Sequence, residues 1–327
     1  MARTSTVRRS QASLWLRLPQ QLRTDIAGYA FIMPWLISIF VFTAYPTLAS
    51  FFFSFHKYNV IQPPRFIGLA NYVNMFTKDP RLMKSIYNTV YYTAAIVPLG
   101  MLSSLSLAVL LNARVRGVGF FRTLYYMPSL VPPVASTLLF MLIMDPRQGL
   151  LNAALRSLGL PALGWFTHPT WSKPALIIMS MWGVGSGTLI FLASLKEVPS
   201  ELLEAATIDG ANAWRRFWGV VIPMISPVIL FNLVMTVIGS FGVFTSAFIA
   251  GSGSGGGLAG GGPSGSAGGP LDSMLMYMVY LYSQAFRYFE MGYASAMAVV
   301  LFIVIMILTL LIFRSSGRWV YYEGAIR

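Results

Sequence analysis

Six apolar stretches without Asp, Glu, Lys or Arg are the feature that most constrains how this 327-residue chain can fold. Each is long enough to cross roughly 30 Å of hydrocarbon as a helix that rises about 1.5 Å per residue. Helices satisfy their backbone hydrogen bonds within one segment, as a lipid environment requires. The sequence therefore predicts an all-α, polytopic membrane helix bundle with about six spans. The predicted spans are Ile26–Phe55, Ser85–Ala113, Thr123–Met144, Pro174–Leu195, Pro223–Ala250 and Met291–Phe313.

Composition supports lipid as the main solvent of this chain. Charged residues make up 10% of it, against roughly a quarter in soluble domains. The net charge of +13 is spread between apolar runs and forms no sustained patch, which argues against a nucleic-acid partner. The chain has no Cys, and its two histidines, His56 and His168, are far apart, so no disulfide or metal site is predicted.

Prolines and glycines predict irregular spans. Proline removes a backbone donor and bends a helix, so several spans should be kinked, broken or shortened. The segment Gly183–Gly187 has nucleotide-fingerprint spacing but lacks the strand-turn-helix context, and close helix packing or a flexible point is the better interpretation. The prolines in or near spans are Pro34, Pro46, Pro98, Pro128, Pro132, Pro133 and Pro227.

The distribution of basic residues predicts the topology. With the N-terminus inside, 14 of the 23 Lys and Arg residues lie on the cytoplasmic side and 9 outside, as the positive-inside rule favours. The first apolar run is too long for a signal-peptide core and is predicted to be retained. We expect a basic cytoplasmic segment at 1–25, the permease domain at 26–313 and a cytoplasmic tail at 314–327. One anomaly remains, because the first outer loop holds five basic residues: Lys57, Arg65, Lys78, Arg81 and Lys84.

A glycine-rich tract separates the fifth and sixth predicted spans. Glycine occupies 11 of the 20 positions from Gly251 to Pro270, a composition typical of a flexible loop, here on the outer side. No Gly-Lys dipeptide occurs in the chain, so the tract is not a Walker A phosphate loop. The chain is expected to carry no cofactor and no ATP site of its own.

The predicted spans contain no Asp, Glu or His, which ion-coupled carriers commonly place on the transport path. Hydroxyls, amides and aromatic rings on the fifth span suit a neutral polar solute. For each residue taken singly, helix packing is the stronger alternative. The candidate path residues are Asn232, Ser240, Phe241, Phe244 and Thr245.

The connection at 196–222 reads as two short helices. Ser200 is a candidate N-cap, and Glu201 suits the positive end of the first helix. Asp209-Gly210 predicts a turn in which glycine takes a positive φ. The sequence Glu204-Ala205-Ala206, then Asp209-Gly210-Ala211 and Phe217, closely resembles the EAA loop of binding-protein-dependent ABC importer permeases, in particular of carbohydrate importers.

An ordered series of further motifs carries this resemblance over most of the chain. The last of them is similar to the subunit type that pairs with a second, non-identical permease. Against the family pattern, Ile222 replaces a common Leu, and the outer glycine tract is expanded. The motifs are Phe66–Tyr72, Asn88-Thr89, Phe121-Arg122, Tyr126–Pro128, Phe286–Ala296 and Arg318–Glu323.

The resemblance implies a mechanism and a set of partners. The loop would enter a cleft of a separate ATPase dimer, which holds ATP and Mg²⁺, and an external solute-binding protein would deliver a sugar-like solute. This chain would lie in the bacterial or archaeal cytoplasmic membrane with both termini inside. The implied coupling residues are Glu204, Ala205, Ala206, Asp209, Gly210, Ala211 and Phe217.

Two other functions remain open on the residues alone. A self-contained facilitator for a neutral solute would fit the uncharged spans but leaves the EAA-like loop unexplained. A polytopic membrane enzyme fits less well, because the carboxylates around Glu204 have no nearby His or Cys. A docking surface is the better interpretation of that cluster.

Overall fold

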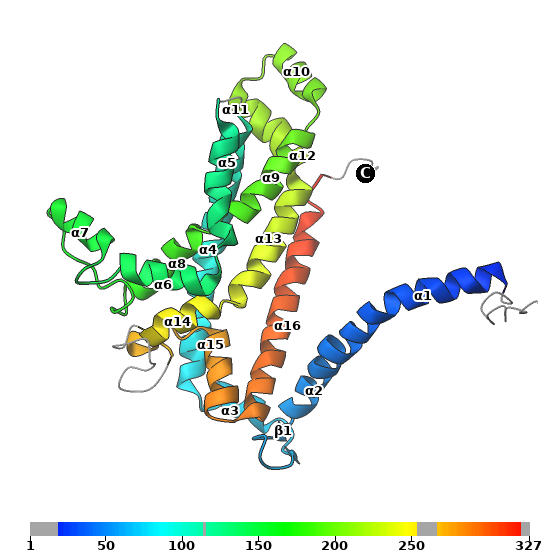
Figure 1. The fold of residues 1–327 in the computed structure, drawn as a ribbon, viewed down its shortest axis with the longest axis vertical. Coiled ribbons are helices and arrows are strands. Elements are labelled where there is room, and N and C mark those ends of the chain that lie inside the picture. The colour runs from blue at the N-terminus through cyan, green and yellow to red at the C-terminus, as the bar shows by residue number, and fades with distance from the viewer. Residues whose placement is uncertain (1–18, 114–115, 254–266, 322–327) are drawn as a thin grey trace, which may run out of the picture. The chain divides into compact units, whose positions relative to one another are not determined.

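The computed structural model describes residues 19–113, 116–253 and 267–321. The chain divides into two compact units, residues 1–52 and 53–327, and each is considered by itself. In the first unit, α1 (Gln20–Ile39) passes through a π-helical segment (Phe40–Ala44) into α2 (Tyr45–Ser54), whose last residues lie in the second unit. The predicted helical architecture is confirmed (Figure 1).

The second unit is a bundle of helices with one very short antiparallel ladder, in which Lys57 pairs with Arg65 and His56 with Phe66. Its elements in chain order are β1 (His56–Lys57), β2 (Arg65–Phe66), α3 (Ala70–Thr77), α4 (Pro80–Asn112), α5 (Val118–Tyr126), a 3₁₀ turn (Met127–Leu130), α6 (Pro133–Ile143), α7 (Leu150–Ser157), α8 (Ser172–Met181), α9 (Gly185–Glu197), α10 (Ser200–Ile208), α11 (Ala213–Arg216), a π segment (Phe217–Val221), α12 (Ile222–Met224), α13 (Ser226–Phe241), α14 (Thr245–Gly253), a 3₁₀ turn (Pro270–Asp272), α15 (Tyr277–Tyr282), a π segment (Ser283–Arg287) and α16 (Met291–Ser316).

All six predicted spans coincide with apolar helices or with bent pairs of helices that together are long enough to cross a membrane. Four are single candidates: Thr24–Ser54, Pro80–Asn112, Ser226–Gly253, which contains both α13 and α14, and Met291–Ser316. The predicted third and fourth spans are each a pair of helices, α5 with α6 and α8 with α9, and counting each pair as one span gives six.

The broken spans have local causes. α5 and α6 are bent by 99° across the proline-rich turn, where neither Pro132 nor Pro133 has an N–H to donate. α8 and α9 are bent by 43° around Gly183. A Cβ on Gly185 would overlap the carbonyl oxygen of Tyr125, so α9 begins in close contact with the end of α5. Close packing, one of the two interpretations of this glycine segment, is confirmed.

The predicted fifth span is interrupted. α13 ends at Phe241, and α14 begins at Thr245 and packs against α6. The two helices run in different directions in Figure 1. Residues on either side of Gly242 therefore face different parts of the bundle.

The largest core cluster includes a stretch for which the sequence predicted no structure. Met274, Leu275 and Met276 are fully buried, directly before α15. This stretch is too short to span a membrane, so its apolar run gave no span signal. Small side chains elsewhere in the cluster, such as Ala175 and Ala296, allow close helix contacts of the kind that membrane bundles use.

The two ends of the glycine-rich tract lie within the described residues. α14 continues to Gly253, and Ala267 is buried. A Cβ on Gly251 would overlap the carbonyl oxygen of Ala267, so the two ends of the tract lie in contact. The middle of the tract, at 254–266, and most of the basic segment at 1–25 lie outside the described residues.

Candidate functional site

The α10–α11 hairpin, residues 200–216, connects the fourth and fifth spans. After α10, Gly210 adopts a φ of +79°, which glycine tolerates best. The N–H groups of Gly210 and Ala211 donate to the carbonyl oxygens of Thr207 and Ala206 at 3.0 and 2.9 Å, the two closing bonds of a Schellman helix end. The predicted turn is confirmed, and its conformation explains why glycine occupies this position.

Side chains that sequence reasoning did not single out hold the hairpin together. Asn212 Oδ1 accepts the backbone N–H of Arg215 at 2.9 Å and caps α11. The Arg216 guanidinium donates to Thr207 Oγ1 at 2.6 Å, which joins the two helices. Asn212 was a signal for the cap in the sequence, because Asn is a preferred N-cap residue. The contact between Thr207 and Arg216 had no such signal, since it forms only when the turn brings the two helices together.

The predicted N-cap of α10 is wrong. Pro199 occupies the cap position and Ser200 is the first helical residue, with no capping bond from a side chain. The proline fixes a φ of −59° just before the helix, and this replaces the expected hydroxyl cap. Glu201 lies in the first turn, as predicted.

The hairpin presents an apolar and acidic surface. No residue of α10 or α11 is buried, and Ile208 is 87% exposed. The indole rings of Trp214 and Trp218 pack edge to face, 5.6 Å apart, and both side chains are largely exposed. Of the implied coupling residues, Glu204, Ala205, Asp209 and Gly210 are exposed, and Ala206, Ala211 and Phe217 are half-buried. Exposed apolar side chains rimmed by polar ones mark a site of interaction with a protein or a membrane.

A cavity of about 390 Å³ lies among α4, α8, α9 and α13. Its polar lining consists of hydroxyls, one amide and backbone, and no charged side chain of the described residues lines it. Ser104 Oγ donates to the carbonyl oxygen of Val184 at 3.2 Å, which closes the wall beside the break in the fourth span. The lining residues with polar side chains are Ser104, Ser180, Ser186, Asn232 and Thr236.

The structure separates the five candidate path residues. Asn232 lines the cavity. Ser240 is buried and donates to the carbonyl oxygen of Val237 at 2.8 Å, while Phe241 lines a separate apolar groove. Phe244 lies beyond the break in an aromatic cluster, 5.1 Å from the ring of Tyr282, and Thr245 begins α14. The sequence placed all five on one continuous helix. The interruption at Gly242 separates Phe244 and Thr245 from the other three, and Ser240 and Phe241 lie farther along α13 than the cavity-lining Asn232.

Three serines that line the cavity were not among the path residues predicted from the sequence. Ser104, Ser180 and Ser186 come from the second and fourth spans, and they meet Asn232 only because the helices pack side by side. Isolated hydroxyls within apolar runs were the available signal. Helix packing was an equally good explanation of that signal.

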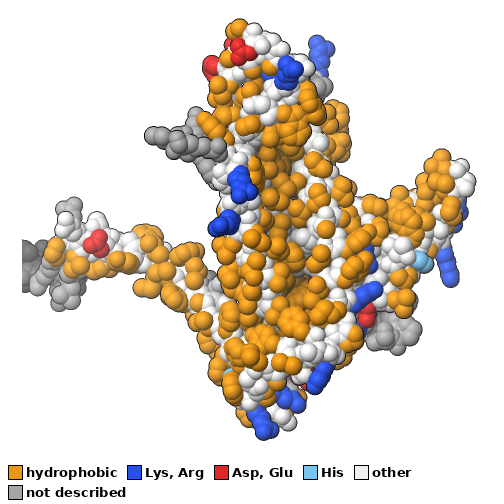
Figure 2. All heavy atoms as spheres, turned by 180° about the vertical axis from the view of Figure 1, so that it is seen from behind, with side chains coloured by type: hydrophobic (Ala, Val, Ile, Leu, Met, Phe, Trp, Pro, Cys, Tyr) orange, Lys and Arg blue, Asp and Glu red, His pale blue; other side chains and the backbone are white. Residues whose placement is uncertain are grey.

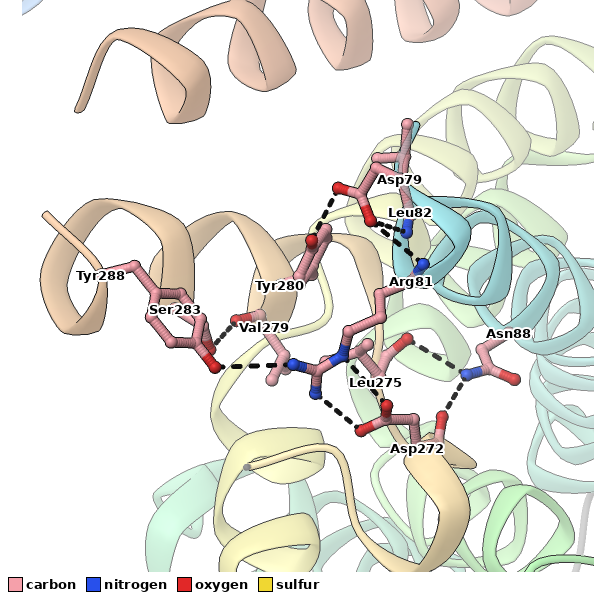
Figure 3. Close-up of polar contacts among 10 residues, drawn as sticks. All are labelled: Asp79, Arg81, Leu82, Asn88, Asp272, Leu275, Val279, Tyr280, Ser283 and Tyr288. Atoms are coloured by element: carbon pink, nitrogen blue, oxygen red, sulfur yellow. Dashed lines mark hydrogen bonds and ion pairs between the residues drawn. The ribbon is translucent and has the colours of Figure 1, made fainter. Parts of the chain in front are cut away.

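A polar network lies at the opposite end of the second unit from the hairpin (Figures 1 and 3). Asp79 caps α4 through the N–H groups of Arg81 and Leu82 and accepts the hydroxyls of Tyr280 and Tyr293, both at 2.6 Å. Burial, with the hydrogen bond to the Asp79 carboxylate, raises the pKa of Tyr280, which keeps that hydroxyl a donor. This network ties α15 to the starts of α4 and α16.

Asn88 extends this network to the buried stretch before α15. Its Nδ2 donates to the carbonyl oxygens of Asp272 and Leu275 at 2.8 and 3.1 Å (Figure 3). Its Oδ1 accepts from Lys173 Nζ at 3.3 Å. Thr89 Oγ1 accepts the backbone N–H of Tyr277 at 2.8 Å. The Asn88-Thr89 pair therefore anchors α15.

The fold, the uncharged cavity and the exposed hairpin together define a polytopic membrane transport subunit. The chain belongs to the family described as binding-protein-dependent transport system inner membrane component, which matches residues 96–320. The matched range contains both the hairpin and the cavity. The family resemblance found in the loop is confirmed, and the chain is an ABC importer permease, not a facilitator or a membrane enzyme.

Known proteins resemble the chain over nearly its whole length. It is 40% identical to the probable ABC transporter permease protein YesP of Bacillus subtilis (strain 168), over 94% of this chain and 96% of that protein. It is 31% identical to the arabinooligosaccharides transport system permease protein of the same organism, with coverages of 90% and 89%. It is also 31% identical to the lactose transport system permease protein of Rhizobium radiobacter, with coverages of 89% and 94%.

A solved structure shares the fold. It is a crystal structure of a bacterial ABC transporter involved in the import of the acidic polysaccharide alginate. The TM-score is 0.76 at 22% identity, and the alignment covers 92% of this chain and 99% of the other. The overall fold of this chain is thus also found in an ABC importer.

Proposed function

We propose that this chain is one of two permeases of an ATP-driven importer for a sugar or sugar-like solute. The exposed α10–α11 hairpin, whose turn is built around Gly210 at positive φ, is the observation that carries this proposal. ATP and Mg²⁺ would bind to a separate ATPase dimer. An external binding protein would deliver the solute.

The hairpin supports ATPase docking through its shape and chemistry. The bonds around Gly210 and between Arg216 and Thr207 fix its shape before any partner arrives. A preorganised element loses less conformational freedom on binding. The exposed Ile208 would enter an apolar cleft, while Glu204 and Asp209 make polar contacts at its rim.

The cavity supports a hydroxylated solute. A sugar hydroxyl both donates and accepts hydrogen bonds, and serine hydroxyls and the Asn232 amide do the same. Relatives named for arabinooligosaccharides and for lactose point to the same class. Asn232 is the residue of this chain that we assign to the solute path.

The orientation follows from the hairpin. If the hairpin meets a cytoplasmic ATPase, the opposite end, with β1 and α3, faces outward. The end of α16 lies on the hairpin side, because the N–H of Tyr321 donates to Ser226 Oγ at the start of α13, at 2.8 Å. The C-terminal tail is therefore cytoplasmic on this account. With six spans, the N-terminus would lie on the same side.

Reconstitution tests the proposed function. Vesicles are prepared that contain this chain, the second permease, the ATPase and the binding protein. They should take up radiolabelled arabinooligosaccharide or lactose only when ATP is present on the side of the membrane where the ATPase lies. Omission of the ATPase should abolish accumulation. Equal downhill flux with and without the ATPase would contradict the proposal and favour a facilitator.

A further inference from the structure

Lys173 is a buried cation without a carboxylate partner. It is the second residue of α8 and is 9% exposed. The N-terminal end of a helix carries a positive partial charge, which disfavours a cation there. Within the described residues, no carboxylate lies within 4.0 Å of its Nζ. The Nζ lies 3.3 Å from Asn88 Oδ1 and 5.5 Å from the ring centres of both Tyr87 and Tyr91, all neutral groups. No ion pair therefore neutralises this charge.

Lys84 adds a second positive charge beside the same two rings. Lys84, Tyr87 and Tyr91 follow one another on α4 at spacings of three and four, which places them on one side of the helix. Lys84 is exposed, and the tyrosines are 58% and 40% exposed, with ring centres 6.3 Å apart. These three residues and Lys173 are called the lysine–tyrosine patch.

The carboxylates that contact the start of α4 are engaged with other groups. Asp272 forms its ion pair with Arg81 at 3.0 Å. Asp79 caps α4 and accepts the hydroxyls of Tyr280 and Tyr293. Neither carboxylate lies within 4.0 Å of a lysine of the patch. The patch is therefore positively charged and suited to an anion.

The patch faces away from the solute cavity. Ile96 and Gly100 are residues of α4 that line the cavity. Tyr87 is nine positions before Ile96, and Tyr91 is nine positions before Gly100. Nine positions make two and a half helical turns of about 3.6 residues, so the rings and the cavity lie on opposite sides of α4. An anion bound at the patch is therefore not on the path assigned to the solute.

An exposed apolar row continues from the patch along α4. Pro98 and Leu102 follow Tyr91 at spacings of seven and four, so they lie on the same side of the helix. Both are exposed, Leu102 by 63%. On the face drawn in Figure 2, apolar side chains likewise cover the middle of the second unit, and Lys and Arg lie mainly toward its ends. Such a band suits contact with lipid chains.

The patch lies at the depth of lipid headgroups. α4 has 33 residues and is about 50 Å long at about 1.5 Å per residue, which exceeds the roughly 30 Å of hydrocarbon. Its first turns, which carry Lys84 and Tyr87, therefore reach the headgroup layer. Tyrosine is enriched at this interface, and lysine attracts anionic headgroups.

We propose that the lysine–tyrosine patch binds the headgroup phosphate of an anionic phospholipid, in the leaflet opposite the hairpin. The phosphate oxygens would accept hydrogen bonds from Lys84 and from the tyrosine hydroxyls. Lys173 would hold a fixed positive charge behind the rings, and one acyl chain would follow Pro98 and Leu102. A soluble phosphate fits less well, because it leaves the apolar row unused.

Lipid binding to the purified full-length chain tests the patch. The delipidated chain in detergent is mixed with equal amounts of phosphatidylglycerol and phosphatidylcholine, and native mass spectrometry measures the ratio of the two bound lipids. The test variant is Lys84→Gln/Lys173→Gln, in which the glutamine side chain introduced at position 173 keeps a donor for Asn88 Oδ1. The matched control, Arg147→Gln/Arg156→Gln, removes two exposed charges at and before α7.

Wild type should bind phosphatidylglycerol about tenfold better than phosphatidylcholine, because each lysine attracts the anionic headgroup. In the test variant the preference should fall to about twofold or less, with phosphatidylcholine binding unchanged. The control and Lys84→Arg should keep the preference of wild type. An excess of glycerol 1-phosphate should not displace phosphatidylglycerol, since it lacks an acyl chain.

Equal binding of the two lipids by wild type, or an unchanged preference in the test variant, would overturn the proposal. Displacement by glycerol 1-phosphate would show a site for soluble phosphate instead. If the test variant loses both lipids, Lys84→Gln decides, since it changes only an exposed side chain, and an unchanged preference there counts against the patch. In the assembled transporter, Leu102→Cys should react with a membrane-soluble maleimide. Complete protection would show that another subunit covers this face, which would also overturn the proposal.

Discussion

Arg81 and Asp272, 191 positions apart in the sequence, form a two-point ion pair: Nε lies 3.1 Å from Oδ2 and Nη2 lies 3.0 Å from Oδ1. The pair holds the turn before α15 against the start of α4 (Figure 3). Asp272 has a φ of +55°, which is uncommon for a residue other than glycine. The turn therefore depends on contacts with neighbouring elements, such as this ion pair. α15 is thus held in place by its neighbours.

Arg81→Gln should lower the melting temperature of the purified permease, with a loss of about 1 kcal/mol, because the pair is bidentate but partly exposed. The exchange Arg81→Asp/Asp272→Arg should recover part of the loss. Thermal unfolding in detergent measures both, with Arg156→Gln as the control. Equal stability of Arg81→Gln and wild type would show that the pair is dispensable.

Gly292→Val should prevent correct packing of α16. Its N–H donates to the carbonyl oxygen of Tyr58 at 3.0 Å, and an added Cβ would overlap the carbonyl oxygen of His56. We expect a loss of about 3 kcal/mol, the upper range for overpacking. Gly317→Val is the matched control, since nothing lies within 4 Å of a Cβ there. Similar yields of folded protein from both variants would contradict the tight contact.

The membrane architecture was predictable from sequence because uncharged runs of spanning length have few alternatives in lipid. The turn at Gly210 was predictable because Asp-Gly after an apolar helix is a strong local signal. Local signals of this kind do not specify which helices meet. The Asp79–Tyr280 and Arg81–Asp272 contacts join residues on opposite sides of the glycine-rich tract, so no spacing in the sequence indicated them.

The candidate path shows the same limit. Asn232 and Phe244 lie on one apolar run, but the break at Gly242 sends only Asn232 to the cavity. A single glycine within a span is more often a packing residue than a break. The serines opposite Asn232 become part of one site only after the helices are packed.

Asn232→Leu should reduce ATP-driven uptake about tenfold, because it replaces the cavity's amide with an apolar side chain. Association of the ATPase with the permeases should be normal. Ser240→Ala is the control, since that hydroxyl is buried and bonds within its own helix. Loss of uptake in Ser240→Ala, with normal uptake in Asn232→Leu, would reverse the assignment of the path.

Single cysteines report the topology in this Cys-free chain. Leu158→Cys and Ile208→Cys are well suited, since these side chains are 74% and 87% exposed. An impermeant maleimide added to intact cells should label position 158 and not 208, and Ser10→Cys should also stay unlabelled. Labelling at 208 from outside would invert the orientation.

The coupling role of the α10–α11 hairpin is the central claim, and Gly210→Val tests it most directly. A β-branched residue is disfavoured at the positive φ of this turn. Gly159 has a φ of +72° and equally open surroundings, so Gly159→Val places the same strain in another exposed turn. Gly210→Asn should retain coupling, because Asn tolerates this conformation.

The measurement is ATPase co-purification together with ATP-driven solute uptake in proteoliposomes, for wild type and these three variants. The account predicts that Gly210→Val reaches the membrane but loses the ATPase, or hydrolyses ATP without uptake, with uptake reduced about tenfold or more. Gly159→Val and Gly210→Asn should couple normally. Normal ATPase association and normal uptake in Gly210→Val would contradict the coupling role of the hairpin.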